Sequence, residues 1–142
     1  MIGTIFAKIK TKKNFDLFNK GDISSFIADW AEDAVFEYPG DLEVSGKIRG
    51  KEEIRKWYEN FLEQFPKTKL TLKSICVKRL FDFTGNNVIC TESEIEVTNK
   101  NDEIYKYSEI SMITLKNRKA IHVRDYIFDM GTWRESWGNY RA

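Results

Sequence analysis

The sequence is poor in the side chains that build metal centres and disulfide frameworks. Its 142 residues include one histidine and two cysteines, whereas a structural zinc site usually needs four closely spaced Cys or His ligands. It also lacks the glycine-rich loop that cradles phosphates in nucleotide-binding proteins. We therefore predict neither a metal site nor a cofactor.

An excess of one charge and long hydrophobic runs are also missing. The 23 basic residues nearly balance the 22 acidic ones, whereas nucleic-acid-binding domains usually carry a strong basic bias. No apolar run approaches the roughly 20 residues that cross a bilayer, and no signal-peptide pattern opens the chain. The sequence predicts a cytoplasmic protein with neither a nucleic-acid nor a membrane partner.

The two cysteines, Cys76 and Cys90, fall on neighbouring predicted strands. With a tight turn at Gly85-Asn86, Cys90 lies opposite Phe81 rather than opposite Cys76. We therefore predict two reduced thiols and no disulfide, as is usual inside the cell. Aromatic residues, in contrast, are abundant, at 14% of the chain with four tryptophans. They either fill a heavy core or line a ligand pocket, and composition fits both interpretations.

The first half of the chain has mainly helical periodicity, and the second half alternates as strands do. Helices are predicted over about 4–18, after Asp22, and over 54–65 before Pro66, with a strand at 34–38 between the last two. Short turns then separate antiparallel strands at 70–81, 88–98, 104–115 and 120–128. Asp129 is the predicted N-cap of a terminal helix. This order predicts a single α+β domain, residues 1–142, with a cone-like curved antiparallel sheet packed on N-terminal helices.

The last predicted strand carries a carboxyl group among apolar residues. Asp125 shares one face with Val123 and Ile127, opposite His122 and Arg124. A buried carboxylate is costly unless it is paired, hydrogen-bonded or used in chemistry. Its raised pKa would also suit proton exchange with a weak carbon acid. Asp125 is therefore the candidate catalytic acid/base, with a structural ion pair as the alternative, whereas we expect His122 at an interface.

The inner face of the predicted sheet and the 54–65 helix would enclose a cone-shaped cavity. Tyr38 is the predicted hydrogen-bond donor to an enolate, Ser93 a partner for a carbonyl or a water, and Trp133 a lid at the mouth. The alternative is that such side chains only fill the core. The predicted pocket-lining residues are Trp30, Phe36, Tyr38, Trp57, Phe61, Ser93, Ile95, Val123 and Trp133. On the outer face, banded charge suits an exposed sheet or a polar dimer interface, with Glu92, Glu94 and Glu96 near His122 and Arg124.

Several motifs, in their order and spacing, resemble the nuclear transport factor 2-like superfamily, which has a cystatin-like fold, and within it the SnoaL-like polyketide cyclases. They are Asn19-Lys20-Gly21-Asp22, the run Trp30 to Gly40, Gly50-Lys51-Glu52-Glu53-Ile54, and Arg124-Asp125-Tyr126. The resemblance spans nearly the whole chain. It implies a cone-like barrel, a deep hydrophobic pocket and a homodimer formed through the outer sheet face.

The resemblance also bears on activity. The Asp–Arg–Asp set of limonene epoxide hydrolases is similar here only at Asp125, because its other two positions fall on Ser93 and Ile95, and its water-holding positions fall on Phe36 and Tyr38. A ketosteroid-isomerase-like site would place its base at Tyr38 and its two proton donors at Asn14 and Ser111, so that set is also broken. The cyclase-like pattern requires only one carboxyl group in an apolar pocket, and Asp125 supplies it.

Three function classes follow from these expectations. The first is a small-molecule pocket protein resembling SnoaL-like polyketide cyclases, acting as a lyase, isomerase or cyclase on an apolar carbonyl substrate with Asp125 as general acid/base. The second is a non-catalytic binding protein for a small apolar ligand. The third is a dimerising interaction module of the same fold, which would have its cavity filled by Trp and Phe side chains.

Overall fold

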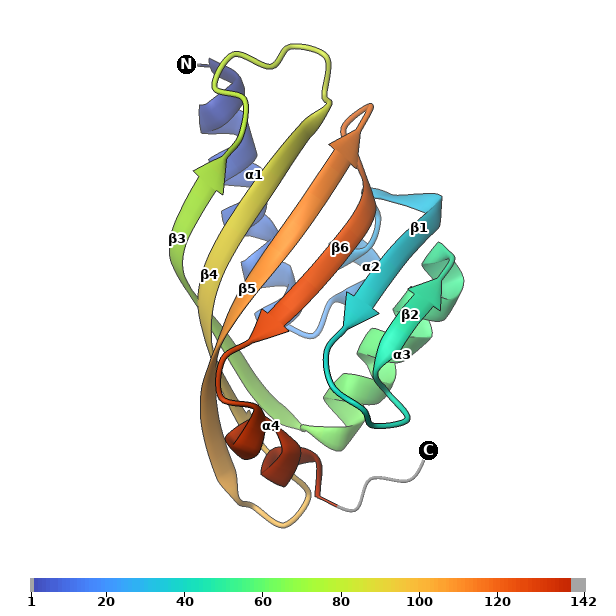
Figure 1. Cartoon of the computed structure of the whole chain (residues 1–142), viewed down its shortest axis with the longest axis vertical. Coiled ribbons are helices and arrows are strands. Elements are labelled where there is room, and N and C mark those ends of the chain that lie inside the picture. The colour runs from blue at the N-terminus through green and yellow to red at the C-terminus, as the bar shows by residue number, and fades with distance from the viewer. Residues whose placement is uncertain (1, 139–142) are drawn as a thin grey trace.

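The computed structural model describes residues 2–138 and shows one domain with its helices on one face of a curved sheet (Figure 1). Three helices, α1 (Ile2–Asn19), α2 (Ile23–Phe26) and α3 (Lys51–Gln64), lie on the concave face, and α4 (Met130–Trp137) lies at one end. The strands are β1 (Trp30–Tyr38), β2 (Gly46–Arg49), β3 (Lys67–Val77), β4 (Asn87–Thr98), β5 (Ile104–Lys116) and β6 (Lys119–Ile127).

The helix boundaries follow from local chemistry that the sequence shows. Gly21 takes a φ of +74° just after α1, a conformation that glycine adopts without strain. Asp22 accepts a hydrogen bond of 3.1 Å from the backbone N–H of Ser25 at the start of α2. Asp129 likewise accepts one of 3.0 Å from Thr132 at the start of α4. These N-caps satisfy backbone donors that a helix leaves unpaired, and both confirm the prediction.

The sheet is mixed rather than wholly antiparallel as expected. Its strand order is β2-β1-β6-β5-β4-β3, and β1 pairs with β6 in parallel while all other neighbours are antiparallel. The parallel pair arises because the meander of β3 to β6 brings its last strand, β6, back beside β1, and the two strands run in the same direction. The segment expected to be a loop before α3 contains the short edge strand β2, which pairs with β1.

The register of β3 and β4 corrects the prediction for the cysteines. Cys76 lies directly opposite Cys90, and both are free thiols. The predicted strand was too long, because β3 ends at Val77 and residues 78–86 form an irregular loop. That loop is held by Asp82, whose carboxylate accepts hydrogen bonds from the backbone N–H and hydroxyl of Thr84 at 2.9 and 2.6 Å.

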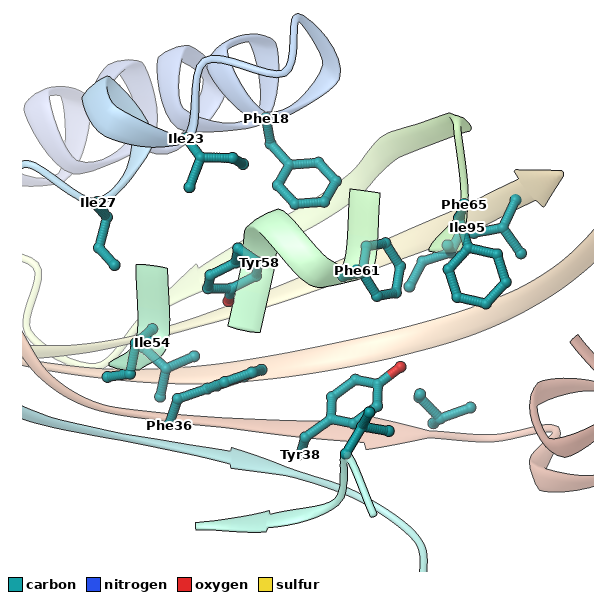
Figure 2. Packing of buried hydrophobic residues seen from close by; sticks show 14 of the residues in the cluster. Phe18, Ile23, Ile27, Phe36, Tyr38, Ile54, Tyr58, Phe61, Phe65 and Ile95 are labelled. Carbon is teal, nitrogen blue, oxygen red and sulfur yellow. The ribbon is translucent and has the colours of Figure 1, made fainter. Parts of the chain in front are cut away.

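The core lies between α1, α3 and the concave face of the sheet, and aromatic rings fill much of it (Figure 2). Tyr58 of α3 stacks on Phe36 of β1 with ring centroids 5.2 Å apart, and Trp57 stacks on Phe61 at 5.6 Å. Large rings each remove much apolar surface from water, and their paired contacts add stability. This packing fixes α3 across the concave face and so determines which side chains point inward.

The convex face carries the charges predicted for it, with one difference. The expected partners Glu92, Glu94 and Glu96 do lie on this face, but His122 and Arg124 instead bond Glu37 of β1. The Glu37 carboxylate is 2.9 Å from His122 Nε2 and accepts a hydrogen bond of 3.0 Å from Arg124 Nε. His122 therefore lies on the opposite face of the sheet from Asp125. Over the described residues, no helix is long and apolar enough to cross a membrane.

Candidate functional site

A cavity of about 160 Å³ lies between the N-terminal helices, α3 and the concave face of the sheet. Its wall is mainly apolar and aromatic, with contributions from Phe18, Phe26 and Tyr58. Such walls with a few polar groups are typical of small-molecule sites. Six of the predicted pocket residues line it: Trp30, Tyr38, Trp57, Phe61, Ile95 and Val123.

The other three predicted pocket residues are buried outside this wall. Phe36 packs against Trp57 and Tyr58, which line the cavity while Phe36 does not. Ser93 is 1% exposed beside Glu109 on the next strand. Trp133 is no lid, because its indole is fully buried and does not line the cavity. It lies on α4, at the end of the sheet opposite the β5–β6 turn (Figure 1). There Trp133 Nε1 donates a 2.9 Å hydrogen bond to the Tyr38 hydroxyl.

Asp125 lines the cavity from β6 and is 9% exposed. As predicted, it shares the buried face with Val123 and Ile127. Its partner is a hydroxyl group rather than a cation. Ser111, directly opposite on β5, donates a 2.5 Å hydrogen bond to Asp125 Oδ1.

A second carboxyl group, which the sequence reasoning missed, lines the same cavity. Glu109 is 8% exposed on β5, and the Ser111 hydroxyl lies 3.1 Å from its Oε1. Ser111 therefore bridges Glu109 and Asp125. The sequence did not determine which side chains of β5 point inward. Their orientation depends on an irregularity between Thr114 and Leu115, which shifts the register of β5 with β6.

The bridging serine determines how protons are distributed in the pair. A serine hydroxyl has one hydrogen, so it donates fully to one carboxyl group at a time, and it accepts a hydrogen bond from the other when that group carries a proton. Among the described residues no Lys, Arg or His forms an ion pair with either carboxyl group. Burial raises the pKa of Asp125 to about 7. Burial and the nearby Asp125 raise the pKa of Glu109 well above its usual value. Glu109 is therefore the proton-bearing member, and Asp125 is the member that titrates near neutral pH.

Hydroxyl groups complete the polar floor of the cavity. Thr91 lies opposite Ser111 on β4, is 1% exposed, and its Oγ1 has no hydrogen-bond partner among the described residues. The Tyr58 hydroxyl points from α3 toward the sheet (Figure 2). Burial raises the pKa values of Tyr58 and Tyr38 well above their usual range, so both phenols keep their protons and can donate hydrogen bonds. Over the described residues, no three metal-ligating side chains cluster.

This arrangement can move a proton. A carboxylate with a pKa near neutrality is matched to removing a proton from carbon at physiological pH, and a neighbouring neutral acid can stabilise the charge that develops. The apolar wall and the burial of both groups limit their contact with water.

Known proteins place the chain in a family. Three solved structures share the fold over most of their length. Bal32a, from a soil-derived mobile gene cassette, has a TM-score of 0.76 at 19% identity and covers 89% of this chain and 92% of its own. A Bacillus subtilis protein proposed to be an isomerase has a TM-score of 0.72 at 25% identity, with coverage of 92% and 91%. SalBIII, an epoxide hydrolase/cyclase-like enzyme in pyran ring formation, has a TM-score of 0.71 at 16% identity, with coverage of 92% and 96%.

No curated protein matches the sequence. The model of the SnoaL-like domain matches residues 12–123, and the chain belongs to this family.

Proposed function

We propose that the protein is an acid–base isomerase or cyclase that acts on an apolar carbonyl compound. The observation that carries this proposal is the pair of buried carboxyl groups, Asp125 and Glu109, joined by the Ser111 hydroxyl in the wall of an apolar cavity. A protein that only fills a core gains nothing from two buried carboxyl groups, because each costs desolvation energy. Perturbed acids in a cavity are typical of catalytic sites.

In the proposed reaction, the Asp125 carboxylate removes a proton from the carbon next to the carbonyl. The C–H electron pair forms a C=C bond, and the carbonyl π electrons move to oxygen. The protonated Glu109 or a tyrosine hydroxyl donates a hydrogen bond to that oxygen. In an isomerisation the substrate is a β,γ-unsaturated ketone, and protonated Asp125 returns the proton to the γ-carbon of the dienolate while the carbonyl re-forms. In a cyclisation the enolate carbon attacks a second carbonyl, and protonated Asp125 gives its proton to the new alkoxide oxygen.

The comparisons agree with this class of chemistry without fixing the substrate. The Bacillus subtilis relative is proposed to be an isomerase, and SalBIII is an epoxide hydrolase/cyclase-like enzyme. Both share the fold, and a family that hosts several chemistries on one fold assigns activity through the residues of each site. Here those residues are the two carboxyl groups.

Hydrogen–deuterium exchange tests the proposal without knowledge of the natural substrate. Cyclohexanone, cyclohexenone and cyclopentanone are incubated with the protein in buffered D₂O, and loss of their α-proton signals is followed by proton NMR. We expect exchange above the buffer rate for at least one ketone. Asp125→Asn and Glu109→Gln should each reduce the protein-dependent rate by about a hundredfold or more.

The matched controls are Asp33→Asn and Glu94→Gln, because both carboxylates are exposed and lie away from the cavity. They should exchange like the unmodified protein. Exchange that survives Asp125→Asn would contradict the proposal. Ligand binding with no exchange by the unmodified protein would instead support the second function class, a non-catalytic binding protein.

We also propose that two copies associate through the convex face of the sheet. Exposed apolar side chains lie on neighbouring strands there, with Met112 of β5 41% exposed and Tyr126 of β6 43% exposed. The Glu37–Arg124 ion pair lies on the same face. An apolar centre with paired charges around it is the usual composition of a specific interface.

A further inference from the structure

A second, wider space lies outside the inner cavity, between α1 and the loop of residues 78–86 that joins β3 to β4. Its volume is about 930 Å³, and its walls include the apolar side chains of Phe6, Ile9, Phe83 and Leu115. Both spaces share the wall residues Ala7, Lys10, Asn14, Asp29, Leu115 and Arg118. The inner cavity therefore meets this vestibule at a neck formed by these shared residues. Leu115 and Arg118 place the neck at the end of the sheet that carries the β5–β6 turn, and Figure 1 shows that this end lies opposite α4.

Two basic side chains border the neck, Lys10 and Arg118, and they differ in whether they have an acidic partner. Lys10 pairs with Asp29 at 3.1 Å. The guanidinium group of Arg118, in contrast, forms no ion pair or hydrogen bond among the described residues, although Arg118 borders both spaces. An arginine fork that lies beside an apolar cavity is suited to hold a carboxylate through two hydrogen bonds.

Arg118 occupies a backbone position that favours glycine. Asn117 and Arg118 have φ values of +51° and +66° in the two-residue turn between β5 and β6, and such turns prefer glycine second. The Arg118 N–H donates a 2.9 Å hydrogen bond to Gly85 O, and its own carbonyl accepts one of 3.4 Å from Lys10. This close approach needs glycine at position 85, because a Cβ there would lie 2.5 Å from Arg118 Cγ. The turn thus fixes an arginine at the neck at a cost in backbone strain.

The inner cavity limits the size of whatever enters it. Its volume of about 160 Å³ is close to the roughly 150 Å³ of an engineered apolar cavity that binds benzene. One six-membered ring fits, and the rest of a larger molecule must extend through the neck. Thr91, which lines this cavity with an unpartnered and buried hydroxyl, offers a hydrogen bond to a polar group on the ring.

We propose that the ligand is a cyclic ketone that also bears a carboxylate, with its ring in the inner cavity and its carboxylate bound by the Arg118 guanidinium at the neck. This proposal rests on the proposed function, because the ring must present its reactive carbon to Asp125. A monoanion fits better than a phosphate, since Asp29 and Asp82 also line the vestibule and limit its positive charge.

Titration calorimetry on the full chain tests this assignment. The probes are phenylacetate, 3-phenylpropanoate and 4-phenylbutanoate, each compared with its primary amide, which keeps the shape and loses the charge. We expect at least one acid to bind about tenfold more tightly than its amide. Arg118→Gln should abolish that preference. Arg49→Gln, which removes an exposed arginine far from both spaces, should leave it unchanged.

Arg118→Gly separates binding from folding. Because glycine is favoured at this turn position, the melting temperature of Arg118→Gly should equal or exceed that of the unmodified protein while the preference for the acid disappears. Equal binding of acids and amides, no binding of any acid, or a preference that survives Arg118→Gln would overturn the assignment. Exchange of the uncharged ketones would still report on Asp125 and Glu109, so the two proposals can fail separately.

Discussion

Two carboxyl groups within reach of one serine hydroxyl give the folded protein a stability that depends on pH. Asp125 and Glu109 have no cationic partner among the described residues, and burial disfavours their charged forms. Their protonated forms are therefore the ones that the folded state stabilises. The unfolded chain, where both groups are hydrated, has no such preference.

The sign of this dependence follows from the raised pKa of Asp125. In the unfolded chain an Asp releases its proton near pH 4, whereas the folded protein holds it until about pH 7. Between these values the folded state binds more protons, so the free energy of unfolding falls as pH rises. We expect a loss on the order of 2–4 kcal/mol from about pH 5 to about pH 8 in urea denaturation.

Asp125→Asn should reduce the slope of this curve, leaving the contribution of Glu109, and should be more stable than the unmodified protein at about pH 8, since its amide has no proton to lose. Asp33→Asn should keep the original slope, because Asp33 is exposed. An unmodified protein that is equally stable at both pH values would show that the two carboxyl groups are not held in their protonated forms.

At this scale the sequence identified Asp125 but not Glu109. The alternation of Val123, Asp125 and Ile127 indicated a buried carboxyl group because the period of a strand is two. The inward face of β5 depends on whether the loops before and after it have an odd or even number of residues. The β4–β5 loop spans residues 99–103, as the predicted strand bounds imply, but the register with β6 shifts near Leu115. That shift has no residue signature that could be recognised in advance.

At the scale of elements, α4 is fastened to the loop after β1 by a contact that only glycine allows. Gly40 has a φ of +92°, and a Cβ at this position would lie 2.2 Å from Cη2 of Trp133. Gly46, at the start of β2, has a φ of +101° with nothing within 4 Å of its Cβ position. The two glycines thus share the backbone constraint but differ in packing.

Gly46→Ala should therefore cost about 1 kcal/mol of unfolding free energy through backbone strain alone. Gly40→Ala should cost roughly 2 kcal/mol more, because the Trp133 indole and its hydrogen bond to Tyr38 must shift. Urea denaturation of the pair isolates the packing cost. Equal losses in the two variants would show that α4 does not pack tightly against this loop.

Element prediction succeeded where a period or a cap was strong and failed where a turn had to be counted. The apolar stripe from Ile54 to Phe65 gave α3, and Asp22 and Asp129 are both N-caps in the structure. The end of β3 was misplaced because Leu80 and Phe81 resemble strand residues, yet they lie in an exposed loop at 57% and 70% exposure. Side-chain bonds within that loop override strand propensity.

At the scale of the whole molecule, a curved sheet and a helical layer leave a space that aromatic side chains only partly fill. The order of helices and strands predicted this architecture, and the resemblance carried by the Asn19–Asp22 and Trp30–Gly40 motifs agrees with the family that the comparisons show. The volume of the cavity depends on how some ten large rings pack against one another. No composition or periodicity determines that packing.

The dimer proposed through the convex face can be tested by the mass of the protein in solution. Size-exclusion chromatography with light scattering should give the mass of two chains for the unmodified protein. Tyr126→Glu should give one, because a charge in the apolar centre of the convex face disfavours its burial. Ile104→Glu, at a 64% exposed position on the same face but at the far end of β5, should remain dimeric. A monomeric unmodified protein at about 0.1 mM would contradict the proposal, because specific homodimers usually bind more tightly than this.

The proposed chemistry depends on a coupled pair of carboxyl groups in the cavity, with the proton on Glu109 and with Asp125 titrating near neutral pH. Carbon-13 NMR of their side-chain carboxyl carbons, followed from about pH 3 to about pH 9, measures this directly. We expect the resonance of Asp125 to titrate near pH 7 while Glu109 remains protonated there, and Asp125→Asn to lower the midpoint of Glu109. Titration of both groups near pH 4, as in exposed carboxyl groups, would contradict it.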